Sequence, residues 1–243
     1  MKNIQNKLNI LSIVNLDEIL YNLDMSVRQI KKSYISCTGY FSSYKNKKQV
    51  TFESVLERDM FMLLEFDPRV VSYIEQPFTL HYTYYDVKPR KYTPDLLITY
   101  KDKTQTVVEI KYKDELLSNQ ELVQKLSLVQ NEIKLQKHLS FEIYTDEMIN
   151  KQYMLNLKHI YNFVNIKEDI EKTKLIEKIL DNTGAITIQE VLNQYDSNKM
   201  KQTFFLPYIW NYVFHNMGTL VNQYEKLTMN SVLRKGYRLN GNY

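Results

Sequence analysis

One stretch of the sequence carries charged residues inside runs that otherwise look like buried β-strands. In KYTPDLLITYKDKTQTVVEIKYKDE, two such runs flank a short polar turn. If this hairpin is symmetric about Asp102, directly opposed residues on its strands place Asp95 across from Glu109. Lys111 follows Glu109 by two positions and therefore projects from the same face, about 7 Å further along the strand. The spacing predicts two carboxylates and an amine side by side.

Two carboxylates that face each other across a hairpin repel unless they share a proton or a cation. A hard divalent ion such as Mg²⁺ resolves the conflict, because it takes oxygen ligands and needs only one or two carboxylates besides water and substrate phosphate. Next to such an ion, Lys111 would stabilise an attacking hydroxide, orient the water or neutralise phosphate charge. The alternative is a solvated strand face on which Glu109 and Lys111 are surface charges.

A third acid lies on a predicted helix upstream of the hairpin. In FESVLERDMFMLLEFDP the apolar residues recur at helical spacing, and the Asp-Pro pair ends the run. Glu57 shares a stripe with Phe61 and Leu64, so its carboxylate lies beside or within the buried face, where an unpartnered charge is costly. Glu57 is therefore the predicted third acid, whereas Glu53 and Glu65 are expected to point outward.

The segments around these residues alternate between helical and strand periodicity. The predicted order is a helix over 52–66, strands within 69–85 and over 91–99 and 105–112, a helix over 119–138, a strand over 139–145 and a helix over 146–163. Turns are expected near Gly39 and Asn46. This order implies an α/β fold with one mixed sheet flanked by helices.

The chain changes character from about residue 166. Helices are predicted over 167–184, 185–195 and 199–216, followed by a hairpin over 218–234. Three short helices and a hairpin are the element order of a winged-helix module, whose third helix commonly enters the major groove of DNA. A small helical docking domain is the alternative. The predicted divisions are a lead and basic arm over 1–50, an α/β domain over 51–165 and a winged-helix-like domain over 166–243.

Positive charge is concentrated near the start of the chain, although the formal net charge is only +4. Residues 26–50 contain no acid but six cations: Arg28, Lys31, Lys32, Lys45, Lys47 and Lys48. The end of the chain, after Glu225, is again basic. Such segments favour a polyanion such as DNA, because phosphate contacts release counterions. Solvated surface charge is the alternative.

The composition excludes several other kinds of chemistry. Cys37 is the single cysteine, so no intramolecular disulfide can form, and the four histidines are scattered. Neither a zinc site nor a Cys/His nucleophile is therefore expected. No apolar run approaches the roughly 20 residues of a membrane span. We expect an intracellular protein and no membrane partner.

A helical glutamate, then Pro-Asp, then Glu-x-Lys on the next strand resembles the PD-(D/E)xK nuclease superfamily. The segments FESVLERDMFMLLEFDPRVVSYIEQPF, YTPDLLI, VVEIKYKDEL and FEIYTDEMIN together are similar to TnsA, the endonuclease subunit of heteromeric bacterial transposases. The resemblance spans roughly residues 26–165 and implies a restriction-endonuclease-like core. By match to the motif, Glu57, Asp95 and Lys111 would be catalytic. Glu109 occupies a position that some relatives fill with Gln and would join the site.

The resemblance also implies a mechanism, partners and a location in the bacterial cytoplasm with the nucleoid. Glu57, Asp95 and Glu109 would ligate Mg²⁺, with Mn²⁺ able to substitute, and a water would attack phosphorus in line to leave 3′-OH and 5′-phosphate ends. The enzyme would cut the 5′ ends of a mobile element in double-stranded DNA, beside a DDE-type transposase and an AAA+ ATPase regulator. Two alternatives remain: a stand-alone restriction-like, phage or repair nuclease of the same fold, and a non-catalytic DNA-binding assembly subunit.

Overall fold

The computed structural model describes residues 37–83 and 88–235. The chain divides into two compact units, with the boundary between Ile149 and Asn150. Within the described ranges, none of the helices combines the length and the apolar character needed to span a membrane.

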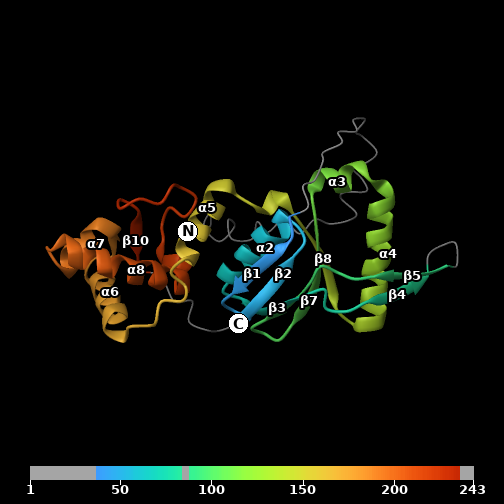
Figure 1. Cartoon of the computed structure of the whole chain (residues 1–243), viewed down its shortest axis with the longest axis horizontal. Coiled ribbons are helices and arrows are strands. Elements are labelled where there is room, and N and C mark those ends of the chain that lie inside the picture. The colour runs from blue at the N-terminus through green and yellow to red at the C-terminus, as the bar shows by residue number, and fades with distance from the viewer. Residues whose placement is uncertain (1–36, 84–87, 236–243) are drawn as a thin grey trace. The chain divides into compact units, whose positions relative to one another are not determined.

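A four-stranded mixed sheet forms the centre of the N-terminal unit (Figure 1). In spatial order its strands are β3 (Val70–Glu75), β6 (Leu96–Tyr100), β7 (Gln105–Lys111) and β8 (Ser140–Thr145). β6 is antiparallel to both of its neighbours, whereas β8 runs parallel to β7. The helices of this unit are α2 (Val55–Phe66), α3 (Lys113–Ser118) and α4 (Gln120–Lys137). A parallel pair needs a crossover connection, which α3 and α4 provide between β7 and β8.

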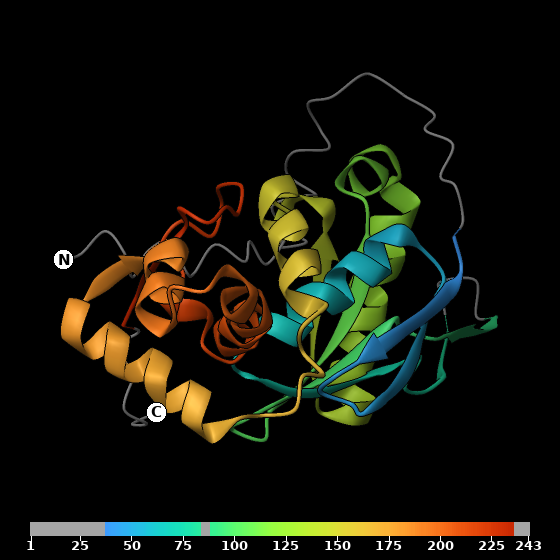
Figure 2. The same ribbon diagram turned by 60° about the vertical axis from the view of Figure 1, so that its left-hand side comes forward.

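Helices α2 and α4 lie on opposite faces of this sheet (Figure 2). On α2, Phe61 packs against Tyr73 of β3 with ring centroids 5.4 Å apart. Tyr73 lies across from Ile98, and Ile98 lies across from Thr106, so these side chains share the α2 face. The next residue, Val107, points the other way and is buried in the apolar cluster that includes one side of α4. The predicted mixed sheet flanked by helices is confirmed.

Two hairpins complete the N-terminal unit. They pair β1 (Gly39–Ser43) with β2 (Lys48–Phe52), and β4 (Leu80–Thr83) with β5 (Pro89–Tyr92). Gly39 lies within β1 rather than at a turn, and the turn predicted near Asn46 is present between β1 and β2. Lys47, the last residue of this turn, has a positive φ of 54°.

The predicted single strand over 91–99 is interrupted. β5 ends at Tyr92 and β6 begins at Leu96. Pro94 lies in the gap and has no N–H to offer a ladder, so the strand cannot continue through it. The break leaves Asp95 just before β6.

The helix predicted over 146–163 also has two parts. A 3₁₀ turn, η2 (Asp146–Met148), is followed by the separate helix α5 (Lys151–Tyr161). Asn150 caps α5 by accepting a hydrogen bond from the backbone N–H of Tyr153, and such a cap starts a new helix.

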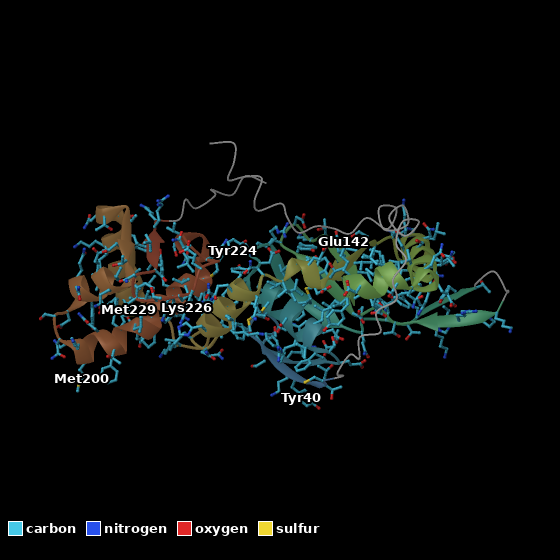
Figure 3. All side chains as sticks on the ribbon, turned by 90° about the horizontal axis from the view of Figure 1, so that it is seen from above. Tyr40, Glu142, Met200, Tyr224, Lys226 and Met229 are labelled. Carbon is cyan, nitrogen blue, oxygen red and sulfur yellow. The ribbon has the colours of Figure 1, made fainter. Side chains whose placement is uncertain are left out.

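The C-terminal unit is mainly helical (Figure 1). Its further elements are α6 (Ile170–Thr183), β9 (Ala185–Thr187), α7 (Ile188–Tyr195), α8 (Lys199–His215), η3 (Met217–Thr219) and β10 (Val232–Arg234). Gly184 ends α6 with a positive φ of 70°, as its sequence position predicts. Met200 and Phe204 on α8 are 71% and 72% exposed, and Figure 3 shows Met200 at the surface.

Two predictions for this unit need correction. The hairpin predicted over 218–234 is not formed as such, because β10 pairs with β9, and residues 218–234 contribute a single internal bridge between Leu220 and Leu233. The division between the units lies before the predicted boundary at 165, because α5 packs on α8. The side-chain amide of Asn156 in α5 also donates to two backbone carbonyls of the C-terminal unit.

Candidate active site

The β6–β7 hairpin has the register that the sequence predicts. Leu96 pairs with Val108, and the pairing continues in step to the tight turn after Tyr100. Asp95 directly precedes β6, so the next position in this register places it across from Glu109. The geometry of the backbone therefore brings the two acids to the same end of the sheet.

An ammonium group lies between these two carboxylates. Lys111 Nζ is 2.7 Å from Glu109 Oε1 and 3.6 Å from Asp95 Oδ2. Asp95 Oδ2 also accepts a hydrogen bond of 2.7 Å from the backbone N–H of Ile110. The hydroxyl of Tyr92, at the end of β5, donates to Glu109 Oε2. Glu109 is only 4% exposed, and each of its two oxygens has a partner, Lys111 or Tyr92.

The protonation of this cluster follows from burial and from the crowding of charge. Burial and the negative charge of Glu109 raise the pKa of Asp95 to about 6, against the opposing effect of Lys111. Burial acts to lower the pKa of Lys111, but the carboxylates of Glu109 and Asp95 outweigh it and the pKa is raised. Burial and Glu109 also raise the pKa of Tyr92. Near neutral pH, Lys111 is an ammonium ion and Tyr92 a hydrogen-bond donor.

Glu57 lies in the first turn of α2 and helps to cap that helix. Ser54 is the N-cap, and its hydroxyl accepts from the Glu57 N–H at 3.1 Å and donates to Glu57 Oε1 at 2.9 Å. Glu57 Oε2 accepts from the backbone N–H of Glu53 at 2.9 Å. Burial raises the pKa of Glu57, these hydrogen bonds oppose the rise, and the charge of Asp95 adds to it. Glu57 and Asp95 are thus close enough to sense each other's charge.

The four predicted site residues come from both layers of the fold. On β7, Glu109 and Lys111 follow Val107 by two and four positions. Their side chains therefore point to the same face of the sheet as Val107, which is the face that α4 covers. Glu57 is carried by α2, on the other face. Asp95, at the end of β6, interacts with both groups, through contact with Lys111 and through its charge on Glu57. Among residues 37–83 and 88–235, no three His, Cys, Asp or Glu side chains are grouped so as to hold a metal ion as they stand.

The chemistry of the cluster suits a hard divalent cation. Carboxylate oxygens are the ligands that Mg²⁺ prefers, and burial together with the neighbouring charge of Glu109 raises the pKa of Asp95. Lys111 and Tyr92 each engage one oxygen of Glu109. Because each carboxylate oxygen can accept more than one partner, a cation bound by Glu109 would share these oxygens with Lys111 and Tyr92 or replace one of them.

Glu65, expected to point outward, is instead 2% exposed. The hydroxyls of Ser43 and Tyr73 donate to its Oε1, and the backbone N–H of Lys45 donates to Oε2 at 3.1 Å. These donors satisfy the carboxylate and make its burial possible. Helical spacing indicates that Glu65 lies on the buried side of α2, because it follows the buried Phe61 by four positions.

Sequence reasoning passed over Tyr92 as a contributor to the site. Its hydroxyl reaches Glu109 from β5, which pairs with β4 and is not part of the four-stranded sheet. No local spacing marks such a contact, because it depends on how the second hairpin packs against the sheet.

The basic residues predicted to contact DNA fall into three groups. Three lie outside the described residues: Arg28, Lys31 and Lys32. The ammonium of Lys45 donates to the backbone carbonyls of Asp67 and Val70 and is therefore engaged within the protein, and its contact with DNA stays a prediction. Burial lowers the pKa of Lys45 to about 8. Lys47 and Lys48 are exposed at the β1–β2 turn, and their contact with DNA stays a prediction.

Comparison with known proteins adds an independent line of evidence. Residues 67–146 match the family model described as TnsA-like endonuclease N terminal. The matched segment contains Asp95, Glu109 and Lys111, and Glu57 precedes it. No curated protein matches the chain. With its mixed sheet between helices, the N-terminal unit fits a restriction-endonuclease-like core, and its residues 67–146 are similar to the TnsA-like endonuclease family.

Proposed function

We propose that this protein is a Mg²⁺-dependent endonuclease that hydrolyses phosphodiester bonds in double-stranded DNA. The observation that carries the proposal is the contact of Lys111 with the carboxylates of Asp95 and Glu109, within the segment that matches the endonuclease family. Glu109 is buried and lies beside a second carboxylate, that of Asp95. Such an arrangement is typical of functional sites.

Glu57, Asp95 and Glu109 would hold the cation, and Mn²⁺ would substitute for Mg²⁺. A bound divalent ion supplies a water of lowered pKa and polarises a phosphate oxygen. The protein's own groups would arrange the rest. Ile110 fixes Asp95 through its N–H, and Tyr92 fixes Glu109 through its hydroxyl.

Lys111 would contribute as a cation. Its raised pKa supports an ammonium rather than a free amine near neutral pH, which favours charge neutralisation over general-base catalysis. In the reaction, the Lys111 ammonium would face the scissile phosphate and stabilise the negative charge that develops there. The products would carry 3′-OH and 5′-phosphate ends.

The biological setting is proposed from the family match. The protein would cut the 5′ ends of a transposon, beside a DDE-type transposase and under an AAA+ ATPase regulator. The C-terminal unit would take a docking or DNA-reading role, which its helices α6, α7 and α8 and the paired strands β9 and β10 support. The exposed Lys47 and Lys48 would follow the DNA backbone.

Plasmid cleavage tests the activity. The full chain with Mg²⁺ or Mn²⁺ should nick or cut supercoiled DNA, alone or with its partner transposase, and a chelator should stop the reaction. Glu57→Ala, Asp95→Ala and Lys111→Ala should each abolish cleavage, whereas Lys103→Ala in the exposed hairpin turn should not. Equal cleavage by the three site variants and the wild type would overturn the assignment.

A further inference from the structure

Gln76 follows β3 in a backbone conformation that few residues other than glycine adopt. Its φ is 45°, in the left-handed region where the Cβ atom crowds the backbone. The side chain is exposed and adds nothing to the apolar core. Such strain persists only where surrounding contacts enforce it, so the contacts of Gln76 need an explanation.

Gln76 makes one hydrogen bond to each side of the candidate site. Its backbone N–H donates to the carbonyl oxygen of Asp95 at 3.0 Å. Its side-chain amide donates to Glu53 Oε1 at 2.9 Å. The first bond holds the residue that precedes β6, and the second holds the turn that precedes α2.

The second bond leads directly to Glu57. The backbone N–H of Glu53, which Gln76 holds by its side chain, donates to Glu57 Oε2 at 2.9 Å. A continuous path of three hydrogen bonds therefore joins Glu57 to the backbone of Asp95 through Gln76. The path links acids that come from different layers of the fold, where neither strand register nor helix geometry fixes their separation.

We propose that Gln76 is a positioning residue that sets the separation between the Glu57 and Asp95 carboxylates, a role that rests on the proposed nuclease function. The left-handed backbone turns its N–H toward Asp95 while its side chain reaches Glu53. A regular extended residue at this position would continue β3 and could not serve both bonds. The chain accepts local strain here because it orders two ligands of one cation in advance.

The test compares two substitutions with different effects on the backbone. Gln76→Gly removes the side-chain bond and relieves the left-handed strain, whereas Gln76→Ala removes the bond and keeps the strain. Gln49→Ala, at an exposed position on β2, is the matched control. For each full-length variant, kcat and KM for Mn²⁺-dependent plasmid cleavage are measured, together with Mn²⁺ affinity by calorimetry and the thermal midpoint.

Gln76→Gly should lower kcat at least about tenfold and weaken Mn²⁺ binding about fivefold. Its KM for DNA should stay within about twofold and its thermal midpoint should not fall, because the glycine relieves strain. Gln76→Ala should lose the same activity and also some stability. In a double-mutant cycle with Glu53→Ala, the second substitution should add little, since both remove one link.

The outcomes separate this role from the activity on which it rests. Wild-type cleavage and Mn²⁺ binding that depend on Asp95, together with kcat and Mn²⁺ affinity in Gln76→Gly equal to those of the wild type, would refute the positioning role alone. A fall in stability that accounts for all lost activity would show a structural role only. A wild-type chain that neither binds Mn²⁺ nor cleaves DNA would refute both the nuclease function and the role of Gln76.

Discussion

The N-terminal unit buries two glutamates in different surroundings. Glu65, on the last turn of α2, is surrounded by donors of hydrogen bonds, two hydroxyls and one backbone N–H. Glu109, on β7, is held by Tyr92 and Lys111 and lies next to a second carboxylate, that of Asp95. The exposed fractions are alike, 2% and 4%, so burial alone does not distinguish the two sites.

The two neighbouring lysines differ in the same way. Lys45, near Glu65, donates its ammonium to backbone carbonyls, and burial lowers its pKa to about 8. Lys111, near Glu109, contacts two carboxylates, and its pKa is raised. A structural charge is satisfied by neutral dipoles, whereas the candidate site gathers charges that are only partly balanced. Two carboxylates with one ammonium leave an excess of negative charge that favours a bound cation.

The largest effect should follow from removing the second carboxylate of the Glu109 region. Asp95→Asn keeps the shape and the acceptor for Ile110 but loses the charge, so cleavage should fall about 10²- to 10³-fold. Asp102→Asn, the same change in the turn of the same hairpin, should leave the rate within about twofold because that side chain lies far from the reacting groups. Plasmid nicking with excess enzyme measures both, and comparable rates for the two variants would erase the proposed contrast.

The Glu65 region should respond in stability instead. Glu65→Ala leaves the buried hydroxyls of Ser43 and Tyr73 without their acceptor, which costs about 3 kcal/mol. For a chain of this length the thermal midpoint should fall by about 10 °C. Cleavage per folded molecule, measured well below that midpoint, should equal the wild-type value. A loss of cleavage in fully folded Glu65→Ala would mean that this cluster is also functional.

Removing one hydroxyl tests how firmly Glu109 is held. Tyr92→Phe deletes the donor to Glu109 without changing the ring, and a hydrogen bond to a charged group contributes about 2 kcal/mol. Tyr100→Phe is the matched control, because the partner of that hydroxyl is another phenol, Tyr144, at 3.4 Å. Chemical denaturation should show the larger loss for Tyr92→Phe, and kcat should fall several-fold there alone. Equal losses of stability and of kcat in the two variants would show that the Tyr92 hydroxyl stabilises Glu109 no more than an ordinary hydroxyl contact does.

The smallest predicted effect is a pH dependence of stability in the metal-free protein. The pKa of Asp95 is raised from 3.8 to about 6 on folding, so the folded state binds the proton more tightly. The stabilising contribution is fully present below the unfolded pKa and is lost as pH rises through the folded one. Asp95→Asn lacks this titration and should therefore exceed the wild type in thermal midpoint by a few degrees at pH 7.5.

At pH 5 the same gap should narrow, because Asp95 is then mostly protonated in the folded wild type. Thermal melts of both proteins in chelator-containing buffers at the two pH values measure the difference. A gap that stays constant, or widens toward pH 5, would contradict a raised pKa for Asp95.

The sequence predicted those parts of the site that depend on local geometry. The two-residue period of a strand and one tight turn were sufficient to bring Asp95 opposite Glu109 and Lys111 beside it. The end of α2 before Pro68 followed from helical spacing and the Asp-Pro pair, although the helix begins at Val55 rather than at residue 52. These features involve residues close in sequence, whose relation the backbone alone determines.

Contacts between distant segments could not be predicted in this way. The burial of Glu65 depends on Ser43 and Tyr73, which lie on two other strands. The engagement of Lys45 with the end of α2 and the start of β3 depends on the same packing. The left-handed backbone of Gln76 was not predicted either, because a positive φ in a residue other than glycine leaves no periodic pattern in the sequence. These features depend on how one helix or strand packs against another.

The hairpin that carries Asp95, Glu109 and Lys111 has a consequence for how the protein assembles. Contacts between residues so close along the chain form quickly, since little loop entropy is lost in bringing them together. During synthesis this hairpin can form as soon as its second strand, β7, has left the ribosome. The same strand carries Lys111, the cation that contacts both carboxylates. The Lys111 ammonium then offsets the repulsion between the two carboxylates. The hairpin therefore does not need a bound metal or nucleic acid in order to form.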